Sequence, residues 1–243
     1  VVREALPPGE FAKALQKKRM SERRRRWILR GSLAAAVVLL LVGGWLAFFS
    51  PVFETRAVVV EGTSLLTVDQ VTAAAAVEMG VPLLRQDVAA ITERVRALTP
   101  VREVEVSRRA PDTIAVAVTE REVSFQRRRE GEWDWVDADG VVFHRTADPR
   151  PGTIQVTTSS TDERLLRDVA VVAAHVPDDL LPEVRRMTAE AVDRITLTLE
   201  GGRTLVWGSA EESELKAEVA AALFASVEAE VYDVSAPRHP TTK

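Results

Sequence analysis

The sequence VREVEVSRRAPDTIAVAVTE, residues 101–120, contains two alternating runs that are separated by Ala-Pro-Asp. In the first run, Val104 and Val106 alternate with glutamates. In the second run, the apolar residues at every second position are Ile114, Val116 and Val118. Side chains two residues apart share one face of a strand, and Pro and Asp favour turns. The stretch therefore predicts an antiparallel hairpin with one buried face.

Two helices and a further strand are expected before this hairpin. The run RAVVVEG, residues 56–62, is rich in β-branched residues and closed by glycine, which indicates a strand. Thr67 is a candidate N-cap for a helix that ends near Gly80, and Asp87 for a second helix that stops at Pro100. In the second helix, spacings of three and four separate the apolar residues Val88, Ile91, Val95 and Leu98. The order strand, helix, helix, strand, strand predicts a small α+β unit over residues 53–121, with the helices on one face of the sheet.

An uncharged apolar run, residues 33–49, precedes this unit. Including Ile28 and Leu29 extends the run to about 22 residues, which is enough to cross a hydrocarbon core of about 30 Å. A cleavable signal would have a shorter apolar region and small residues at its end, whereas this run ends in Phe48 and Phe49 followed by Ser50 and Pro51. The pattern predicts one retained transmembrane helix over residues 28–49.

Basic residues gather on one side of this run. Residues 1–31 contain 10 Lys and Arg against three Glu, whereas the rest of the chain contains 22 basic and 33 acidic residues. The positive-inside rule then predicts a cytoplasmic tail over residues 1–27 and an extracytoplasmic body, in a single-pass protein of the cell membrane. The expected topology signal is the block Arg23, Arg24, Arg25 and Arg26. Because the block lies against the apolar run, it indicates the lipid bilayer as its partner rather than nucleic acid.

A second domain is expected over residues 122–234, with mixed β structure and flanking helices. Hairpins are predicted at Asp139-Gly140 and around Gly201-Gly202. One helix is expected from about Asp162 to His175. Another, within residues 210–227, should bury a face made of Leu215, Val219, Ala222 and Val227. The run EVYDVS, residues 230–235, predicts the final strand, and Pro237 and Pro240 should end regular structure in a C-terminal tail over residues 235–243.

Short motifs follow one another in a fixed order along the chain. The first unit contains V-x-V-x-G at residues 58–62, G-V-P-L-L at residues 80–84 and the stretch 100–122. The second half contains W-x-x-x-D-x-x-G-x-x-F at residues 133–143, L-x-x-G-x-x-L-x-x-G at residues 199–208, a helix with Lys216, and VYDVS. The first set resembles a polypeptide-transport-associated (POTRA) domain, and the whole order resembles the FtsQ/DivIB family of cell-division proteins. Glu122 departs from the proline that is common in the family.

This resemblance implies a membrane-anchored scaffold at the division septum. The implied partners are the bitopic proteins FtsB and FtsL and other divisome proteins. The implied role is to recruit and regulate the septal peptidoglycan-synthesis machinery. The family's further aromatic contacts beyond the last strand have no counterpart in APRHPTTK, residues 236–243.

The candidate catalytic and metal-binding residues do not form a recognisable site in the sequence. The chain has no cysteine, and its histidines His144, His175 and His239 stand far apart. Asp134, Asp137 and Asp139 could be paired carboxylates or the start of a calcium loop, but a turn with solvated acids is the simpler interpretation. Arg127 to Arg129 are expected on a solvated strand edge, and Trp133 and Trp135 in the core. No metal, cofactor or enzyme activity is predicted.

A sheet edge is the predicted partner-binding site. The last expected strand supplies Val231, Tyr232, Asp233 and Val234, and an edge strand offers unpaired backbone groups to a strand from another protein. The valines would set the register and Tyr232 would be the aromatic anchor. A second candidate edge in the first unit is either residues 57–60 or residues 101–106. The alternatives are a secretion or assembly component that contains a POTRA domain, and a membrane-anchored cell-wall enzyme that uses Asp134 or Asp137.

Overall fold

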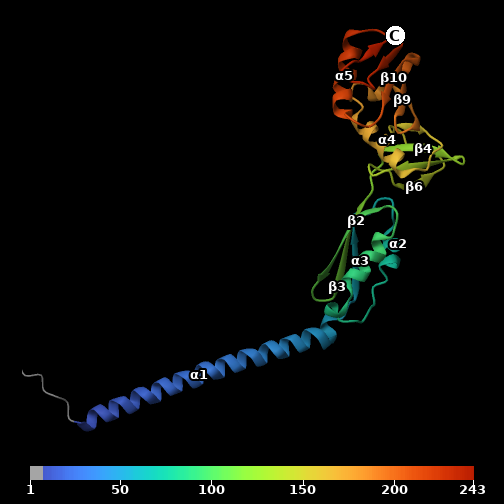
Figure 1. The fold of residues 1–243 in the computed structure, drawn as a ribbon. Coiled ribbons are helices and arrows are strands. Elements are labelled where there is room, and N and C mark those ends of the chain that lie inside the picture. The colour runs from blue at the N-terminus through green and yellow to red at the C-terminus, as the bar shows by residue number, and fades with distance from the viewer. Residues whose placement is uncertain (1–7) are drawn as a thin grey trace, which may run out of the picture. The chain divides into compact units, whose positions relative to one another are not determined.

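The structure is a computed structural model that describes the backbone of residues 8–243 and the side chains from Trp27 onward, except those of Leu29 and Ala47. Its first element is the helix α1, Pro8–Phe49 (Figure 1). Across residues 8–243, no helix combines the length and the apolar character needed to cross a membrane. Ser50 then caps a short 3-10 helix, η1, Pro51–Phe53, by accepting a hydrogen bond from the backbone N–H of Val52.

The chain forms two compact units. The first contains Val1–Val59, Val77–Val88 and Val106–Ala115, and the second contains Val60–Ala76, Ala89–Glu105 and Val116–Lys243. A three-stranded sheet has the order β1-β3-β2. Its strands are β1, Ala57–Glu61; β2, Val101–Arg109; and β3, Thr113–Glu120. Both candidate edges of the first predicted unit, β1 and β2, are therefore outer strands of this sheet.

Two helices accompany the three-stranded sheet, as predicted. They are α2, Val68–Ala75, and α3, Val88–Arg96, and a 3-10 turn, η2, Leu83–Arg85, lies between them. Thr67 caps α2 through a capping box with Gln70, in which each side chain bonds the other residue's backbone N–H. The expected end near Gly80 is wrong, because Ala76 takes a left-handed conformation with φ of 44° and ends the helix.

A nine-stranded mixed sheet forms most of the remaining structure, in the order β12-β11-β10-β9-β8-β7-β4-β5-β6. Its strands in chain order are β4, Phe125–Arg129; β5, Glu132–Val136; β6, Val142–Thr146; β7, Gln155–Thr157; β8, Val184–Ala191; β9, Arg194–Leu199; β10, Thr204–Gly208; β11, Val231–Asp233; and β12, Thr241–Thr242. Short 3-10 turns, η3, Leu181–Glu183, and η4, Glu200–Gly202, precede β8 and β10. The β9–β10 hairpin around Gly201-Gly202 agrees with the sequence prediction, and β4, β7, β8 and β12 are additions to it.

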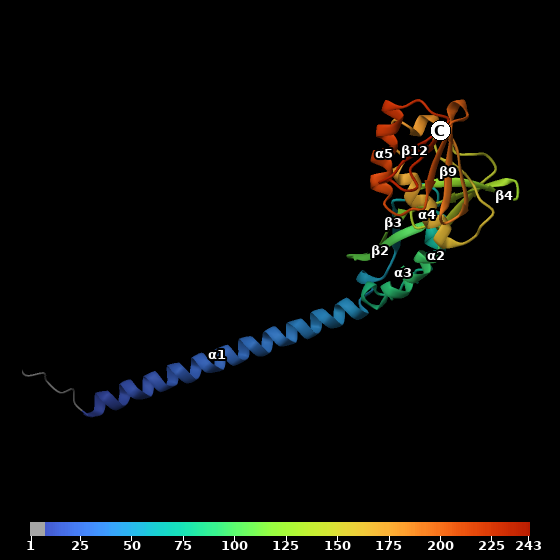
Figure 2. The same cartoon turned by 45° about the horizontal axis from the view of Figure 1, so that its top comes forward.

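Two helices pack with this sheet. The first, α4, Glu163–His175, has Asp162 as its N-cap, which agrees with the expected start, and its apolar residues Leu165, Val169 and Val172 are buried. The second, α5, Ser213–Ser226, links β10 to the parallel strand β11 and lies beside the strands at this end of the sheet (Figures 1 and 2). Helices α4 and α5 contact each other, and one apolar cluster joins α4 to the buried sides of the strands.

The predicted inward face of α5 is right only in part, because Val219 packs against the core whereas Ala222 is exposed. The buried residues of α5 are Ser213, Lys216 and Ala220, whereas Val227 lies just past the helix and is 41% exposed. The polar groups can face inward because each has a partner: Trp207 Nε1 donates to Ser213 Oγ at 3.1 Å, and Lys216 Nζ donates to the carbonyl oxygen of Ser209 at 2.8 Å. Local hydrogen bonds therefore outweigh the apolar pattern in setting the rotation of this helix.

Candidate functional site

The predicted final strand is not the edge of its sheet. Strand β11 pairs in parallel with β10 on one side and antiparallel with β12 on the other. The backbone N–H groups of Glu230 and Val231 both donate to the carbonyl oxygen of Lys243, and the N–H of Lys243 donates to Val231 at 2.9 Å. The expectation that Pro237 and Pro240 end regular structure is therefore wrong, and the outer strand is β12.

Tyr232 is part of the core rather than an exposed aromatic group. Its side chain is 1% exposed and its ring stacks on Phe224 with the ring centroids 3.9 Å apart. Its hydroxyl donates to the carbonyl oxygen of Val227 at 2.8 Å and accepts from the N–H of Ala229 at 3.0 Å. Tyr232 thus fixes the segment between α5 and β11, and it is not available as a free anchor for a partner.

The neighbours of Tyr232 hold β11 in register. Val231, Tyr232 and Asp233 face Thr204, Leu205 and Val206 of β10. Val234 is fully buried, and its N–H donates to the carbonyl oxygen of Val206 at 3.0 Å. Asp233 Oδ1 accepts from the N–H of Ser235 at 2.9 Å. The predicted site residues therefore support the terminal strands, and the exposed groups at this edge belong to Thr241, Thr242 and Lys243.

Lys216 of α5 is a buried cation that bonds the turn after β10. The burial of this charge was not predicted from the sequence. The residue is 2% exposed, and burial lowers the pKa of its ammonium group, an effect that Glu211, Glu212 and Asp233 oppose. Its hydrogen bond to Ser209 holds the turn that follows β10. Its role is to fix that turn, which also holds Ser213 through the carbonyl oxygen of Ala210.

Two of the three acidic residues expected to be solvated, Asp134 and Asp137, are buried, whereas Asp139 is exposed as expected. Asp134 is fully buried and Asp137 is 1% exposed. Asp134 pairs with Arg127 and Arg145, with 3.4 Å between Arg127 Nε and Asp134 Oδ2 and 2.7 Å between Arg145 Nε and Asp134 Oδ1. Burial lowers the pKa of the Arg127 guanidinium, and the charge of Asp134 opposes this effect. In this charge cluster, Arg127, Asp134 and Arg145, the first two side chains are buried and that of Arg145 is 41% exposed, so the prediction of a solvated Arg127 is wrong.

Trp133 and Trp135 lie on the opposite face of β5 from Asp134 and Val136. Both are half-buried, whereas Val136 is fully buried and belongs to the main core. The Trp135 ring contacts His144 with the ring centroids 4.8 Å apart, and the Arg150 guanidinium lies 5.1 Å from its centroid. The prediction that these tryptophans occupy the core is wrong, because alternation along the strand gives the core positions to residues 134 and 136.

Asp137 organises a turn. Its Oδ1 accepts from the N–H groups of Asp139 at 2.9 Å and Val141 at 2.8 Å, and its Oδ2 pairs with Arg121. The side-chain positions described from Trp27 onward contain no group of three or more His, Cys, Asp or Glu residues that could hold a metal ion. The side chains of the predicted topology signal, Arg23 to Arg26, lie outside the described residues.

Comparison with known proteins gives the family. The model described as POTRA domain, FtsQ-type, matches residues 53–121, and the model described as cell division protein FtsQ/DivIB, C-terminal, matches residues 125–235. Cell division protein FtsQ of Streptomyces bingchenggensis is 36% identical over 207 residues, which cover 81% of this chain and 78% of the relative. Cell division protein FtsQ of Mycobacteroides abscessus is 34% identical over 203 residues, which cover 82% of this chain and 64% of the relative.

One solved structure is also similar. It is the major extracytoplasmic domain of the cell-division protein DivIB from Geobacillus stearothermophilus, at 13% identity and a TM-score of 0.34. The match covers 45% of this chain and 99% of that one. The two family models together match most of the chain, and the relatives exceed 30% identity over most of its length. The chain belongs to the FtsQ/DivIB family of cell-division proteins.

Proposed function

We propose that the chain is a bitopic scaffold of the bacterial divisome that binds FtsB- and FtsL-like proteins by strand addition at its C-terminal sheet edge. In this role it recruits and controls septal peptidoglycan synthesis at the division site and catalyses no reaction itself. The observation that carries the proposal is the end of the nine-stranded sheet on β12. Within residues 8–243, no strand pairs with the outer side of β12.

The backbone geometry of β12 suits an added strand. In an antiparallel pair, residues alternate between those that exchange hydrogen bonds with the neighbour and those whose N–H and C=O face away. Val231 and Lys243 exchange both bonds. Thr242, the next residue along, therefore directs its N–H and C=O away from β11, where a partner strand can pair with them. Val231, Tyr232, Asp233 and Val234 support this edge by fixing the strand behind it.

The substitution Thr242→Pro tests the edge. Proline removes the N–H of residue 242 and leaves the bonds of Lys243 to β11 in place. Loss of one backbone hydrogen bond of about 0.5–1.5 kcal/mol predicts a two- to tenfold weaker affinity for the extracytoplasmic segment of the FtsB-like partner. The control Thr242→Val retains the N–H and should bind as the native chain does. Unchanged affinity of the proline variant, with an unchanged unfolding midpoint, would show that the partner binds elsewhere.

The membrane anchor is a second part of the proposal, and it depends on the sequence pattern of residues 22–49. The helical side chains of Leu39, Leu40 and Leu41 are 72%, 76% and 67% exposed, so neighbouring elements leave this apolar surface uncovered. A helix of this character is stable when hydrocarbon surrounds it. We expect residues 51–243 to be extracytoplasmic, with Arg23 to Arg26 retained in the cytoplasm.

Protease added to intact spheroplasts tests this topology. It should digest the body and leave a membrane-protected fragment that contains the N-terminal tail. Replacing Arg23 to Arg26 by glutamine should reduce the fraction of chains with an accessible body, whereas replacing the exposed Arg185 and Arg186 by glutamine should not. A body that stays intact in spheroplasts but is digested after lysis would contradict the orientation.

A further inference from the structure

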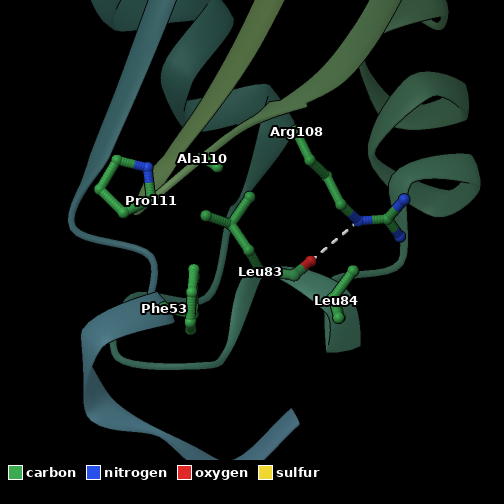
Figure 3. A pocket seen from close by; sticks show the side chains of 6 residues that line it. All are labelled: Phe53, Leu83, Leu84, Arg108, Ala110 and Pro111. Carbon is green, nitrogen blue, oxygen red and sulfur yellow. Dashed lines mark hydrogen bonds between the residues drawn. The ribbon is translucent and has the colours of Figure 1, made fainter. Parts of the chain in front are cut away.

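An apolar pocket of about 220 Å³ lies immediately after the first helix. It is lined by Phe53, Leu83, Leu84, Arg108, Ala110 and Pro111 (Figure 3), all of which belong to the first compact unit. Leu84 is 47% exposed, and Val52, next to Phe53, is 60% exposed. The pocket and these two side chains make one apolar surface, here called the juxtamembrane surface.

The only charged side chain in the lining, Arg108, bonds the backbone through two of its nitrogens. The Arg108 guanidinium donates to the carbonyl oxygen of Leu83 at 2.8 Å, drawn in Figure 3, and to that of Gln86 at 2.7 Å. These bonds hold the Arg108 guanidinium against the backbone carbonyl groups of η2 and Gln86. The pocket wall is left to aliphatic and aromatic groups, which favours an apolar occupant over an anion.

We propose that the juxtamembrane surface docks on the outer leaflet of the lipid bilayer, with the pocket at the level of the headgroups. This inference rests on the membrane anchor proposed above. The occupant follows from the distance between the end of the anchor and the pocket. Phe53 follows Phe49 by four residues, so at about 3.6 Å per residue it lies at most about 14 Å beyond it.

The observed backbone shortens this distance. The N–H of Ser50 donates to the carbonyl oxygen of Leu46 at 2.8 Å, which continues the helical pattern, and Pro51–Phe53 is a 3-10 helix. A 3-10 rise of about 2 Å per residue places Phe53 about 8 Å beyond Phe49. The headgroup region of each leaflet is about 5–8 Å deep, so a span that ends at Phe49 holds Phe53 at the level of the headgroups.

Hydrogen bonds hold η2, which forms the other side of the pocket, close to residues 53–55. Thr55 bonds Val81 through its N–H and its hydroxyl, each at 2.9 Å. Gln86 Nε2 donates to Thr55 Oγ1 at 3.0 Å, and Gln86 is 6% exposed. These contacts fix η2, and Leu84 with it, beside residues 53–55. Leu84 therefore stays close to residues 53–55 unless these hydrogen bonds break.

The absence of cysteine from the sequence allows a direct depth measurement. The full chain is inserted in nanodiscs as three single-cysteine variants, Leu84→Cys, Leu181→Cys and Leu39→Cys, each labelled with an environment-sensitive fluorophore. Leu181, which is 38% exposed, is a matched surface leucine in the second unit. Brominated phospholipids should quench the label at residue 84 and at residue 39, and leave the label at residue 181 unchanged. Val52→Cys, at a still more exposed position, repeats the test if the label at residue 84 perturbs the fold.

The reference at residue 39 separates the two proposals. Quenching at residue 39 without quenching at residues 84 and 52 would overturn the docking inference and leave the anchor intact. No quenching at residue 39 would overturn the anchor, and the docking inference with it. If the label at residue 84 responds only when the FtsB-like partner is added, the surface binds protein instead of lipid and the inference is wrong.

Discussion

Replacement of Asp134 by asparagine should strongly destabilise the chain, because it leaves a buried cation without its counter-charge. Asp134 is fully buried, and Arg127, at 3.4 Å, is 3% exposed. Arg127 Nη1 also donates to the carbonyl oxygen of Ser160, but this neutral acceptor cannot replace a carboxylate. The third member of the cluster, Arg145, has a side chain that is 41% exposed, so it can turn to water.

The size of the loss follows from these exposures. Breaking a buried ion pair by removing one partner costs about 3–5 kcal/mol, and a folded body of this size loses about 2–4 °C of melting temperature per kcal/mol. Asp134→Asn should therefore lower the melting temperature by about 6–20 °C. Arg145→Gln should lower it by much less. In the double variant Arg127→Met with Asp134→Leu, both charges are replaced by apolar groups, and stability should return to within about 1 kcal/mol of the native chain.

The assays are thermal and urea unfolding of the full chain in detergent micelles, followed by the fluorescence of the tryptophans in the second unit. Equal urea slopes for the variants would show that the same transition is compared. The reasoning would be refuted if Asp134→Asn were as stable as the native chain. It would also be refuted if the double variant lost as much stability as the single variants Arg127→Met and Asp134→Leu together.

Three further predictions concern single sites. Desolvation raises the pKa of Glu120, but hydrogen bonds from the backbone N–H groups of residues 64–66 outweigh it and lower the pKa below 4.5. The stabilisation by Glu120 should therefore be present above pH 4.5 and be lost as the pH falls through the folded-state pKa. Glu120→Gln should lower the unfolding free energy at pH 7, and a difference from the native chain that persists at the lowest pH would argue against this linkage. Gly140→Ala should destabilise the chain strongly, because φ is +80° and the new Cβ would lie 2.7 Å from a backbone nitrogen of α4. At Gly131, φ is +94° and nothing lies within 4 Å, so Gly131→Ala should show only the backbone cost of about 1–2 kcal/mol in a thermal melt. Equal losses of stability at the two glycines would contradict the steric argument. Tyr232→Phe should cost about 0.5–1.5 kcal/mol in urea unfolding, because it removes two hydrogen bonds to partly exposed backbone groups. A variant as stable as the native chain would show that water replaces the hydroxyl.

Local patterns predicted the elements whose own residues decide them. The β9–β10 hairpin follows from two alternating runs around adjacent glycines, and α4 follows from a capping aspartate and an apolar stripe. The order of elements over residues 57–120 was also predicted, because each apolar run repeats with the spacing of either a strand or a helix and is followed by a residue that ends it. In these segments the local preference and the final packing agree.

The errors arose where distant residues decide the outcome. Arg127 and Asp134 were expected in solvent because each is costly to bury alone, and the parallel pairing of β4 with β7 that helps to enclose them is invisible in the local sequence. Strand β12 has two residues, too few for any periodic signal, and it forms because the backbone of Lys243 bonds to Glu230 and Val231. The outer strand of the sheet was therefore assigned one strand too early.

The position of β7 has a mechanical consequence. This strand has three residues, and on each side only two residue pairs join it in parallel to β4 and β8. In the order of the sheet, β7 is the strand that connects strands β8 to β12 with β4, the first strand of this sheet in the chain. If the proposed partner at β12 were pulled away from the proposed anchor, the load would concentrate on these short ladders. Rupture under tension should begin there, and β12 would separate as one piece with β8 to β11.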